Sequence, residues 1–237
     1  MICIYDKHVG ETMSEVISRF SKENNIKEKI AYAGRLDPLA YGKIIILTGN
    51  DIYKKDDYCN KCKIYETWII DGITTDTYDI MGLITSICSS SSTTSINEGN
   101  YKQYYPPYSS IPIRIGNIRK PLWYYTKNNI EIPDELKPYK YVTLYNATKL
   151  DEKYISSNEL LDIILDRIKK VITGDFRQND IIEQWTHYLQ NKSDDNYKHD
   201  NYKISKWRFE ISSGGYIRYI ANMTGSTCYD INRITYL

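Results

Sequence analysis

The sequence predicts an α+β fold, because strand patterns and helix patterns both occur along its 237 residues. Short apolar or alternating runs at residues 2–5, 43–49, 64–70 and 141–147 are typical of strands. Apolar residues at helical spacing near residues 14–20, 156–173 and 181–189 indicate helices. A hydrophobic content of 41% is enough to bury a core. The length fits one large domain, or one domain plus an insertion, over residues 1–237.

The first thirty residues are expected to form a strand followed by a helix. Thr12 or Ser14 can cap this helix, and Val16, Ile17 and Phe20 share its apolar face.

Two further strands are predicted before residue 80. Residues 43–49 form a buried apolar run that a turn closes. Residues 64–70 alternate, which places Tyr65, Thr67 and Ile69 on one side. Residues 89–94 are a polar low-complexity tract, which we interpret as a flexible loop.

The clearest helix pattern covers residues 156–173. Ser156 and Glu159 fit a capping box at its start, and Gly174 is suited to end it. A second helix is predicted at residues 181–189, and a polar stretch rich in Lys, Asn and Asp follows through Lys203.

Charge, cysteine content and hydropathy limit the partners and the compartment that fit this chain. The net charge is +1, so any contact with nucleic acid must come from local basic clusters. Five cysteines at irregular spacing favour reduced thiols in a cytoplasmic compartment. The sequence has no signal-peptide pattern and no apolar run that could span a bilayer. We expect a soluble monomer without a membrane partner.

Metal and cofactor motifs are weak in this sequence. Cys59 and Cys62 have metal-ligand spacing, but no second pair or nearby histidine completes a tetrahedral set. The chain has three histidines and no Walker or Rossmann glycine pattern. These residues therefore favour neither a zinc site nor a Walker or Rossmann nucleotide site.

Residues 34–42 present one carboxylate inside a turn flanked by glycines. Pro38 fixes its own φ and biases Asp37 towards extended geometry. Gly34 and Gly42 allow a sharp turn or a close approach to a ligand. An aspartate held in this way can be directed at a substrate atom. The alternative interpretation is an ordinary loop before a strand.

The residues of this loop resemble the aspartate loop, G-x-L-D-P-L-A-x-G, of the TruB family of pseudouridine synthases. Five further segments resemble family motifs in the family's order, at residues 6–14, 63–65, 72–82, 103–109 and 212–218. His8 and Tyr105 stand where the family has proline. The resemblance covers roughly residues 1–150 and 207–237. Residues 151–206 have no counterpart of this size, and we interpret them as a helical insertion with a flexible, charged tail.

The resemblance implies a pseudouridine synthase fold, with a central mixed, largely antiparallel sheet flanked by helices. It implies isomerisation of uridine to pseudouridine in RNA, without metal or cofactor. The expected substrate is tRNA, at the uridine conventionally numbered 55 in the T-loop. Residues 231–233 resemble the end of the family's catalytic domain, so we expect no C-terminal RNA-binding (PUA) module.

The resemblance also implies roles for individual residues. Asp37 is the expected nucleophile, Arg218 its ion-pair partner, and Tyr65 the ring that stacks on the target base. The structural alternatives are that Asp37 only caps a turn, that Arg218 is a surface charge and that Tyr65 packs in the core. Tyr32 stands where the family usually has a histidine, and we expect it to support the flipped base by stacking. The full set of expected substrate-binding residues is Tyr32, Gly34, Arg35, Leu36, Tyr216 and Ile231.

A second group of residues is suited to RNA contact outside the pocket. Arg114, Arg119 and Lys120 precede Trp123, and cations interleaved with rings suit phosphates and exposed bases. An ordinary solvated face is the alternative interpretation.

Two rival functions remain open at this stage. Synthases of the RluA and RsuA types also use a G-R-L-D loop, which Arg35 matches, and would act on ribosomal or other RNA. A non-catalytic RNA-binding or RNA-folding protein that retained the fold is the other.

Overall fold

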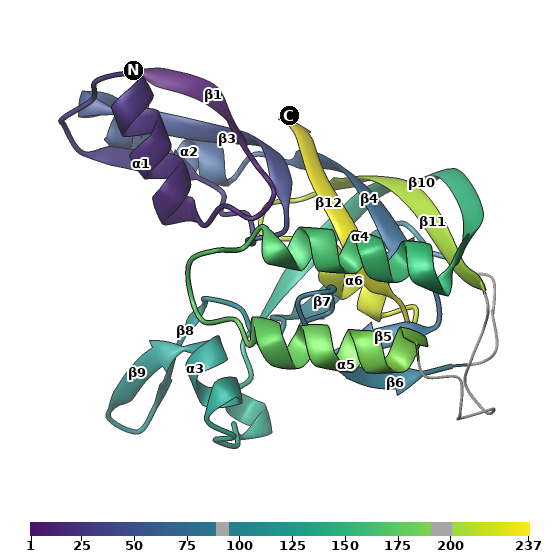
Figure 1. Ribbon diagram of the computed structural model, residues 1–237. Coiled ribbons are helices and arrows are strands. Elements are labelled where there is room, and N and C mark those ends of the chain that lie inside the picture. Colours follow the sequence, from purple (N-terminus) through teal and green to yellow (C-terminus); the bar gives the residue numbers. More distant parts are fainter. Residues whose placement is uncertain (89–94, 191–200) are drawn as a thin grey trace.

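The computed structural model describes residues 1–88, 95–190 and 201–237. The tract at 89–94 and most of the polar stretch after the second predicted helix, residues 191–200, lie outside the described residues. The described residues form a curved eight-stranded sheet with two small hairpin sheets beside it (Figure 1).

The central sheet is mixed and largely antiparallel, as predicted. Its main path runs β1 (Ile2–Lys7), β3 (Tyr41–Thr48), β12 (Thr227–Tyr236), β4 (Lys63–Ile70), β11 (Asn201–Ile211), β10 (Tyr139–Ser156) and β7 (Gly99–Tyr104), and β2 (Ile30–Ala33) pairs with β3. Within this sheet, only β12 and β3 pair in parallel, where Asn232 lies opposite Tyr41 and Arg233 opposite Gly42. This pairing brings the C-terminal strand beside the strand that follows the aspartate loop.

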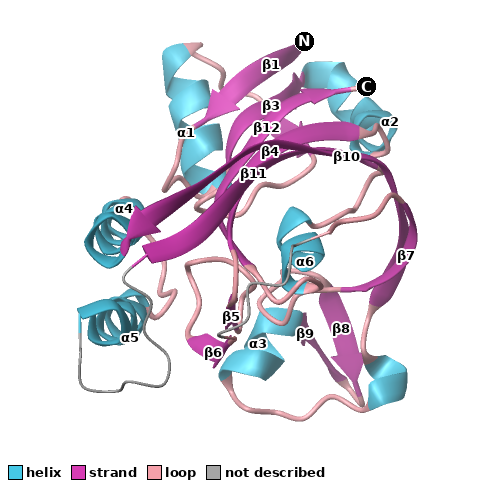
Figure 2. Ribbon diagram, turned by 90° about the vertical axis from the view of Figure 1, so that its right-hand side faces the viewer, coloured by secondary structure: helices cyan, strands magenta, loops and turns pink. Residues whose placement is uncertain are grey.

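Helices cover both faces of the sheet. They are α1 (Met13–Glu23), α2 (Lys55–Cys59), α3 (Leu122–Lys127), α4 (Ser157–Lys169), α5 (Gln178–Gln190) and α6 (Ile217–Asn222). The small sheets pair β5 (Ile73–Thr75) with β6 (Ile84–Ile87), and β8 (Pro112–Ile115) with β9 (Ile118–Pro121). Figure 2 shows the sheet curling around α6, with β8, β9 and α3 beyond it. No described helix is long and apolar enough to cross a membrane.

Strand alternation divides the core between the two faces. On β11, Tyr202 and Ile204 pack in the cluster that holds α4 and α5, whereas Phe209 and Ile211 pack in the cluster that holds α6. Successive side chains of a strand point to opposite faces, so one strand can serve both clusters. Helix α6 is thereby held inside the curve of the sheet.

Local signals predicted the first helix well. The side chain of Thr12 caps α1 in a capping box with Glu15, so Thr12 rather than Ser14 is the cap. The face predicted for residues 64–70 is also confirmed, because Tyr65, Thr67 and Ile69 are all buried on β4.

The segment predicted as an insertion holds two helices but has different limits. Helix α4 starts from the predicted capping box of Ser156 and Glu159, and Figures 1 and 2 show α5 lying beside it. The helix ends at Lys169, earlier than predicted. Ile172, expected on the buried apolar face of this helix, is 82% exposed. Residues 151–156 and 201–206 belong to β10 and β11, which pair with each other.

Candidate active site

The loop that carries Asp37 is held from beneath by a buried lysine. Lys7 is 1% exposed, and its Nζ donates to the carbonyl oxygens of Pro38 at 2.9 Å and Ala40 at 2.5 Å. Burial lowers the pKa of Lys7 to about 8. The backbone N–H of Gly10 also donates to the Pro38 carbonyl, at 2.9 Å. Both ends of the Asp37–Ala40 turn are therefore fixed.

Gly42 permits the close approach of β12 to this loop. Its φ is +102°, and a Cβ there would lie 2.3 Å from the carbonyl oxygen of Arg233. Only glycine adopts this backbone conformation without strain and leaves room for the neighbouring strand.

Asp37 and Arg218 form an ion pair at the centre of the site. Nε of Arg218 donates to Oδ2 of Asp37 at 2.9 Å, and its Nη1 donates to the carbonyl oxygen of Thr77 at 2.6 Å. The Arg218 side chain is 4% exposed and that of Asp37 30% exposed. Burial acts to lower the pKa of Arg218, but the neighbouring carboxylates of Asp37 and Asp79 outweigh it and raise that pKa. The guanidinium is thus a fixed positive charge behind a partly open carboxylate.

Asp79 is a second carboxylate behind the same arginine. It is buried, and its Oδ1 accepts from Thr77 Oγ1 at 2.8 Å and from the Met81 N–H at 2.9 Å. Burial raises the pKa of Asp79 to about 6, although the charge of Arg218 opposes the shift. Sequence reasoning had matched Asp79 to a family motif without giving it a place in the site.

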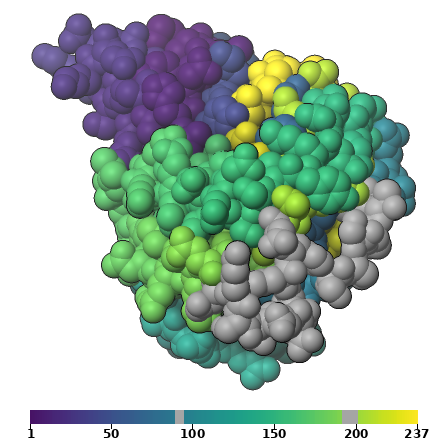
Figure 3. Space-filling view, turned by 45° about the vertical axis from the view of Figure 1, so that its right-hand side comes forward, coloured from purple at the N-terminus to yellow at the C-terminus, as the bar shows by residue number. Residues whose placement is uncertain are grey.

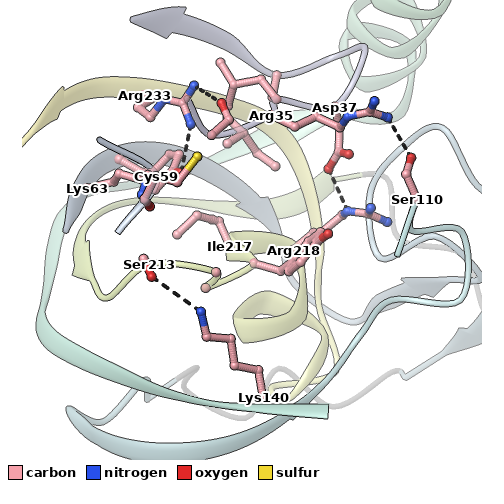
Figure 4. A pocket seen from close by; sticks show the side chains of 18 of the residues that line it. Arg35, Asp37, Cys59, Lys63, Ser110, Lys140, Ser213, Ile217, Arg218 and Arg233 are labelled. Carbon is pink, nitrogen blue, oxygen red and sulfur yellow. Dashed lines mark hydrogen bonds and ion pairs between the residues drawn. The ribbon is translucent and has the colours of Figure 1, made fainter. Parts of the chain in front are cut away.

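A cavity of about 300 Å³ opens beside Asp37 (Figure 4). It brings together all three residues expected to be catalytic and five of the six expected to bind substrate. These are Asp37, Tyr65 and Arg218, with Gly34, Arg35, Leu36, Tyr216 and Ile231.

Tyr32 does not line this cavity, and its expected role beneath the flipped base is not supported. Its ring packs against the cluster that holds α1, and its hydroxyl accepts from Nη2 of Arg35 at 3.2 Å. Successive side chains of a strand point to opposite faces, and Tyr32 accordingly packs in a different cluster from its neighbours Ala31 and Ala33. Tyr32 instead orients Arg35, which does line the cavity.

The cavity is more cationic than the sequence suggested. Its lining holds one carboxylate, that of Asp37, and five cationic side chains, those of Arg35, Lys63, Lys140, Arg218 and Arg233. Burial, together with the charge of Arg233, lowers the pKa of Lys63 to about 8. Nζ of Lys140 donates to Oγ of Ser213 at 3.4 Å. Such a lining suits a polyanion such as a nucleic-acid backbone.

Arg233 ties three parts of the site together and was missed from the sequence. Its Nη2 donates to the Gly34 carbonyl at 2.8 Å and its Nε to the Lys43 carbonyl at 2.7 Å. Its Nη1 lies 3.5 Å from the hydroxyl of Tyr65, whose ring is buried. Residues 231–233 had been compared with a family segment, but nothing local to them indicates which carbonyls the guanidinium reaches.

Tyr216 is positioned by a buried glutamine. The backbone N–H of Tyr216 donates to Oε1 of Gln103 at 2.7 Å, and Nε2 of Gln103 donates to the Gly214 carbonyl at 2.9 Å. Burial and the charge of Asp37 raise the pKa of the Tyr216 hydroxyl to about 12. Its ring is therefore a neutral wall of the cavity near neutral pH.

The residues expected to contact RNA lie apart from this cavity. Arg114 on β8 and Arg119 on β9 face each other in register, and Lys120 lies with its Nζ 5.5 Å from the ring centre of Tyr124. Trp123 on α3 is 40% exposed and lines a second cavity that also reaches Asp37. Among the described residues, no group of three or more His, Cys, Asp or Glu side chains is placed to hold a metal ion.

Comparison with known sequences gives a family match. The profile of the TruB family pseudouridylate synthase N-terminal domain matches residues 22–158. The tRNA pseudouridine synthase B of Fusobacterium nucleatum is 32% identical over 159 residues, which cover 64% of this chain and 53% of that protein. The tRNA pseudouridine synthase 4 of Saccharomyces cerevisiae is 25% identical over 274 residues, covering 97% of this chain and 64% of that protein.

Comparison with solved structures supports the fold. A chain of the Cbf5-Nop10-Gar1 complex matches 99% of this chain and 48% of its own length, with a TM-score of 0.51 and 13% identity. This chain spans roughly half the length of the Fusobacterium relative and of the Cbf5 complex chain.

Proposed function

The chain belongs to the TruB family of pseudouridylate synthases, and from this premise we propose that it converts uridine to pseudouridine in RNA. The proposed substrate is tRNA, at the uridine conventionally numbered 55 in the T-loop. We propose a cytoplasmic monomer, and the five cysteines, all free thiols in the structure, suit a reducing compartment.

The Asp37–Arg218 pair at the edge of the cavity is the observation that carries the proposal. The reaction breaks the glycosidic C–N bond, turns the uracil and forms a C–C bond, so it needs a carboxylate that can attack or stabilise developing charge. Arg218 engages Oδ2, and Oδ1 of Asp37 has no hydrogen-bond partner in the part of the chain that the structure describes. We assign Oδ1 as the nucleophilic oxygen.

The walls of the cavity suit a base turned out of an RNA loop. Tyr65 and Tyr216 offer rings against which uracil can stack, and Ile231 provides an apolar contact. Stacking of this kind contributes about 1–3 kcal/mol for each base, which offsets the few kcal/mol needed to extrude it.

The cationic residues of the lining are assigned to the phosphates that flank the target. Lys140 and Arg35 form no ion pair with a carboxylate among the described residues, so they are available to an incoming polyanion. Nζ of Lys63 instead donates to the carbonyl oxygens of Cys59 and Lys61, at 2.8 and 2.6 Å. Arg114, Arg119, Lys120 and Trp123 are proposed to extend this contact along the RNA from the β8–β9 hairpin and α3.

The test is to incubate the protein with a tRNA transcript that carries the uridine and to map pseudouridine. Asp37→Asn is expected to abolish the product and to leave the affinity for RNA, measured by filter binding, largely intact. Asp134→Asn is a matched control, because that carboxylate is 90% exposed and pairs with Lys137 away from the cavity.

The outcomes distinguish the rival functions. Product from Asp37→Asn would remove Asp37 from the assigned role. Product from the unaltered protein on ribosomal RNA fragments but not on tRNA would favour a synthase of the RluA or RsuA kind. Tight binding with no product on any RNA would favour a non-catalytic RNA-binding protein.

A further inference from the structure

We propose that the connection between α4 and α5, residues 170–177, completes a second nucleotide pocket that takes the base directly adjacent to the target uridine. This inference rests on the proposed function and deepens it. It gives the helical segment, which has no counterpart in the motif pattern of the family, a place in RNA recognition.

The second cavity has a volume of about 400 Å³ and shares its inner wall with the first. Both cavities are lined by Asp37 and Arg218, together with Arg35, Leu36 and Ser110. Consecutive nucleotides of one strand are joined through a single phosphate. A nucleotide in the second cavity would therefore be the immediate neighbour of one placed at Asp37 in the first.

The outer wall of this cavity is aromatic and comes from three separate segments. Phe176 belongs to the α4–α5 connection, Trp123 to α3, and Tyr108 to the loop before β8. Met13 and Met81 add apolar surface deeper in the cavity. Flat aromatic walls of this kind bind nucleobases by stacking, and the cavity volume lies in the range of small-ligand sites.

The connection is fixed at its front by two ion pairs. Arg177 holds Asp76 through both carboxylate oxygens, at 2.6 and 3.1 Å, and its guanidinium carbon lies 4.1 Å from the ring centre of Tyr108. Asp175 accepts from Nζ of Lys127 on α3 at 2.5 Å. Arg177 adopts a left-handed backbone with φ +63°, which is uncommon for a non-glycine residue. These ion pairs flank Phe176, whose backbone N–H donates to Oε1 of Gln178 at 2.9 Å and whose ring packs against the core cluster of α4 and α5.

Helix α5 fixes the connection from behind. Trp185 is fully buried, and its Nε1 donates to the Gly82 carbonyl at 3.2 Å. Oε1 of Gln184 accepts from the Ile84 N–H at 2.6 Å. Both contacts join α5 to the segment that follows Thr77 and Asp79, which themselves line the cavity. Figure 3 shows the α4–α5 segment between the N-terminal region and the region of α3.

The polar groups of the cavity suit the edge of a base and its phosphate. Thr77, Asp79 and Ser110 place hydroxyl and carboxylate oxygens along the lining, where they can meet donors on a base edge. Arg35 lines both cavities and is in no ion pair in the described part of the chain, so it can provide positive charge for the phosphate that joins the two nucleotides. The occupant is therefore a nucleotide and not a purely apolar ligand.

The first experiment pairs a change in the protein with a change in the RNA. A tRNA T-arm hairpin is made with an abasic nucleotide on one side or the other of the target uridine, and kcat and KM are measured separately. For the unaltered protein, loss of one neighbouring base is expected to lower kcat/KM on the order of tenfold, mainly through KM. Phe176→Ala should show a loss of the same order on the intact hairpin and no further loss on the abasic one.

Matched variants separate this role from a general loss of structure. Ile172→Ala lies in the same connection but is 82% exposed and does not line the cavity, so it should behave as the unaltered protein on both RNAs. Phe176→Leu keeps apolar volume without the ring, and it should lose the response to the abasic site as Phe176→Ala does. Independent losses that multiply in the combined experiment would overturn the proposal.

A second measurement does not depend on turnover. In an Asp37→Asn background, 2-aminopurine is placed beside the target uridine of the hairpin. Its fluorescence is expected to be quenched on binding, and to be quenched less with Phe176→Ala, which leaves the rings of Trp123 and Tyr108 in the wall. Equal quenching with and without Phe176 would overturn the pocket.

The two measurements also separate this inference from the proposed activity. Quenching that depends on Phe176 without product from the unaltered protein would support the pocket and refute the activity. Product whose yield is unchanged by Phe176→Ala and by loss of either neighbouring base would support the activity and refute the pocket.

Discussion

Arg218 and Asp37 stand 181 positions apart in the chain, yet Nε of one lies 2.9 Å from Oδ2 of the other. The same guanidinium reaches the carbonyl oxygen of Thr77 at 2.6 Å. One side chain from α6 therefore joins the loop between β2 and β3 to the turn that follows β5. The geometry of the candidate nucleophile depends on both contacts being made together.

Arg218→Lys should lower kcat/KM while the protein remains folded. An ammonium cannot reproduce the two directed contacts of the guanidinium, and a hydrogen bond to a charged group is worth about 1.5–3 kcal/mol, which is roughly a tenfold to hundredfold change in rate. The measurement is single-turnover pseudouridine formation beside a thermal melt. Arg208→Lys, which alters a more exposed pair with Glu66, should leave the rate unchanged. A fully active Arg218→Lys protein would contradict the assigned role.

Lys7→Met should destabilise the protein, because it leaves the carbonyls of Pro38 and Ala40 without their buried donor. Loss of a partner for buried polar groups costs about 1–3 kcal/mol, and we expect a decrease in the free energy of unfolding near the upper limit. Urea unfolding measures it. Lys43→Met removes an exposed pair with Asp6 and should change stability by about 1 kcal/mol or less. Equal effects of the two substitutions would show that Lys7 does not support the loop.

Gly42→Ala should be more damaging than Gly116→Ala, although both glycines have positive φ. At Gly116 a Cβ meets nothing within 4 Å, so only backbone strain of about 1–2 kcal/mol is expected. At Gly42 the Cβ would lie 2.3 Å from the Arg233 carbonyl, and overpacking adds about 1–3 kcal/mol. Unfolding midpoints of the two variants measure which substitution costs more stability. A Gly42→Ala protein more stable than Gly116→Ala would contradict the prediction.

The stability of the protein should respond to pH through Asp79. Its pKa is raised by burial to about 6 from an ordinary value of 3.8, so between these values the folded state binds more protons than the unfolded state. This contribution to stability is present below about pH 4 and is lost as the pH rises through about 6.

Asp79→Asn removes that titration and keeps a side-chain oxygen as an acceptor for Thr77 and Met81. Its free energy of unfolding relative to the unaltered protein should therefore rise by about 2–3 kcal/mol between pH 4 and pH 7. Chemical denaturation at both pH values measures the difference. A constant difference across this range would mean that Asp79 titrates as in an unfolded chain.

Local sequence signals predicted the elements that depend on local forces. The capping boxes at Thr12 and Ser156 fixed the starts of α1 and α4, because both partners lie within one turn of helix. The length of β10 was underestimated, since much of this strand is exposed and its residues carry little apolar alternation. The end of α4 was missed because Ile172 fits the helical period although it faces solvent.

The sequence alone determined strands β1, β3 and β4, the first part of β10, helices α1, α4 and α5, and the loop that presents Asp37. These elements follow from short-range spacing of apolar, capping and turn residues. The resemblance to the family had implied Arg218 as the partner of Asp37, but only the tertiary structure decided that Lys7 lies beneath the loop and Asp79 behind the guanidinium. It also turned the ring of Tyr32 away from the cavity and placed Phe176 beside it. Such contacts join residues that are distant in the chain. They are set by burial and sheet pairing, and the identity of neighbouring residues does not reveal them.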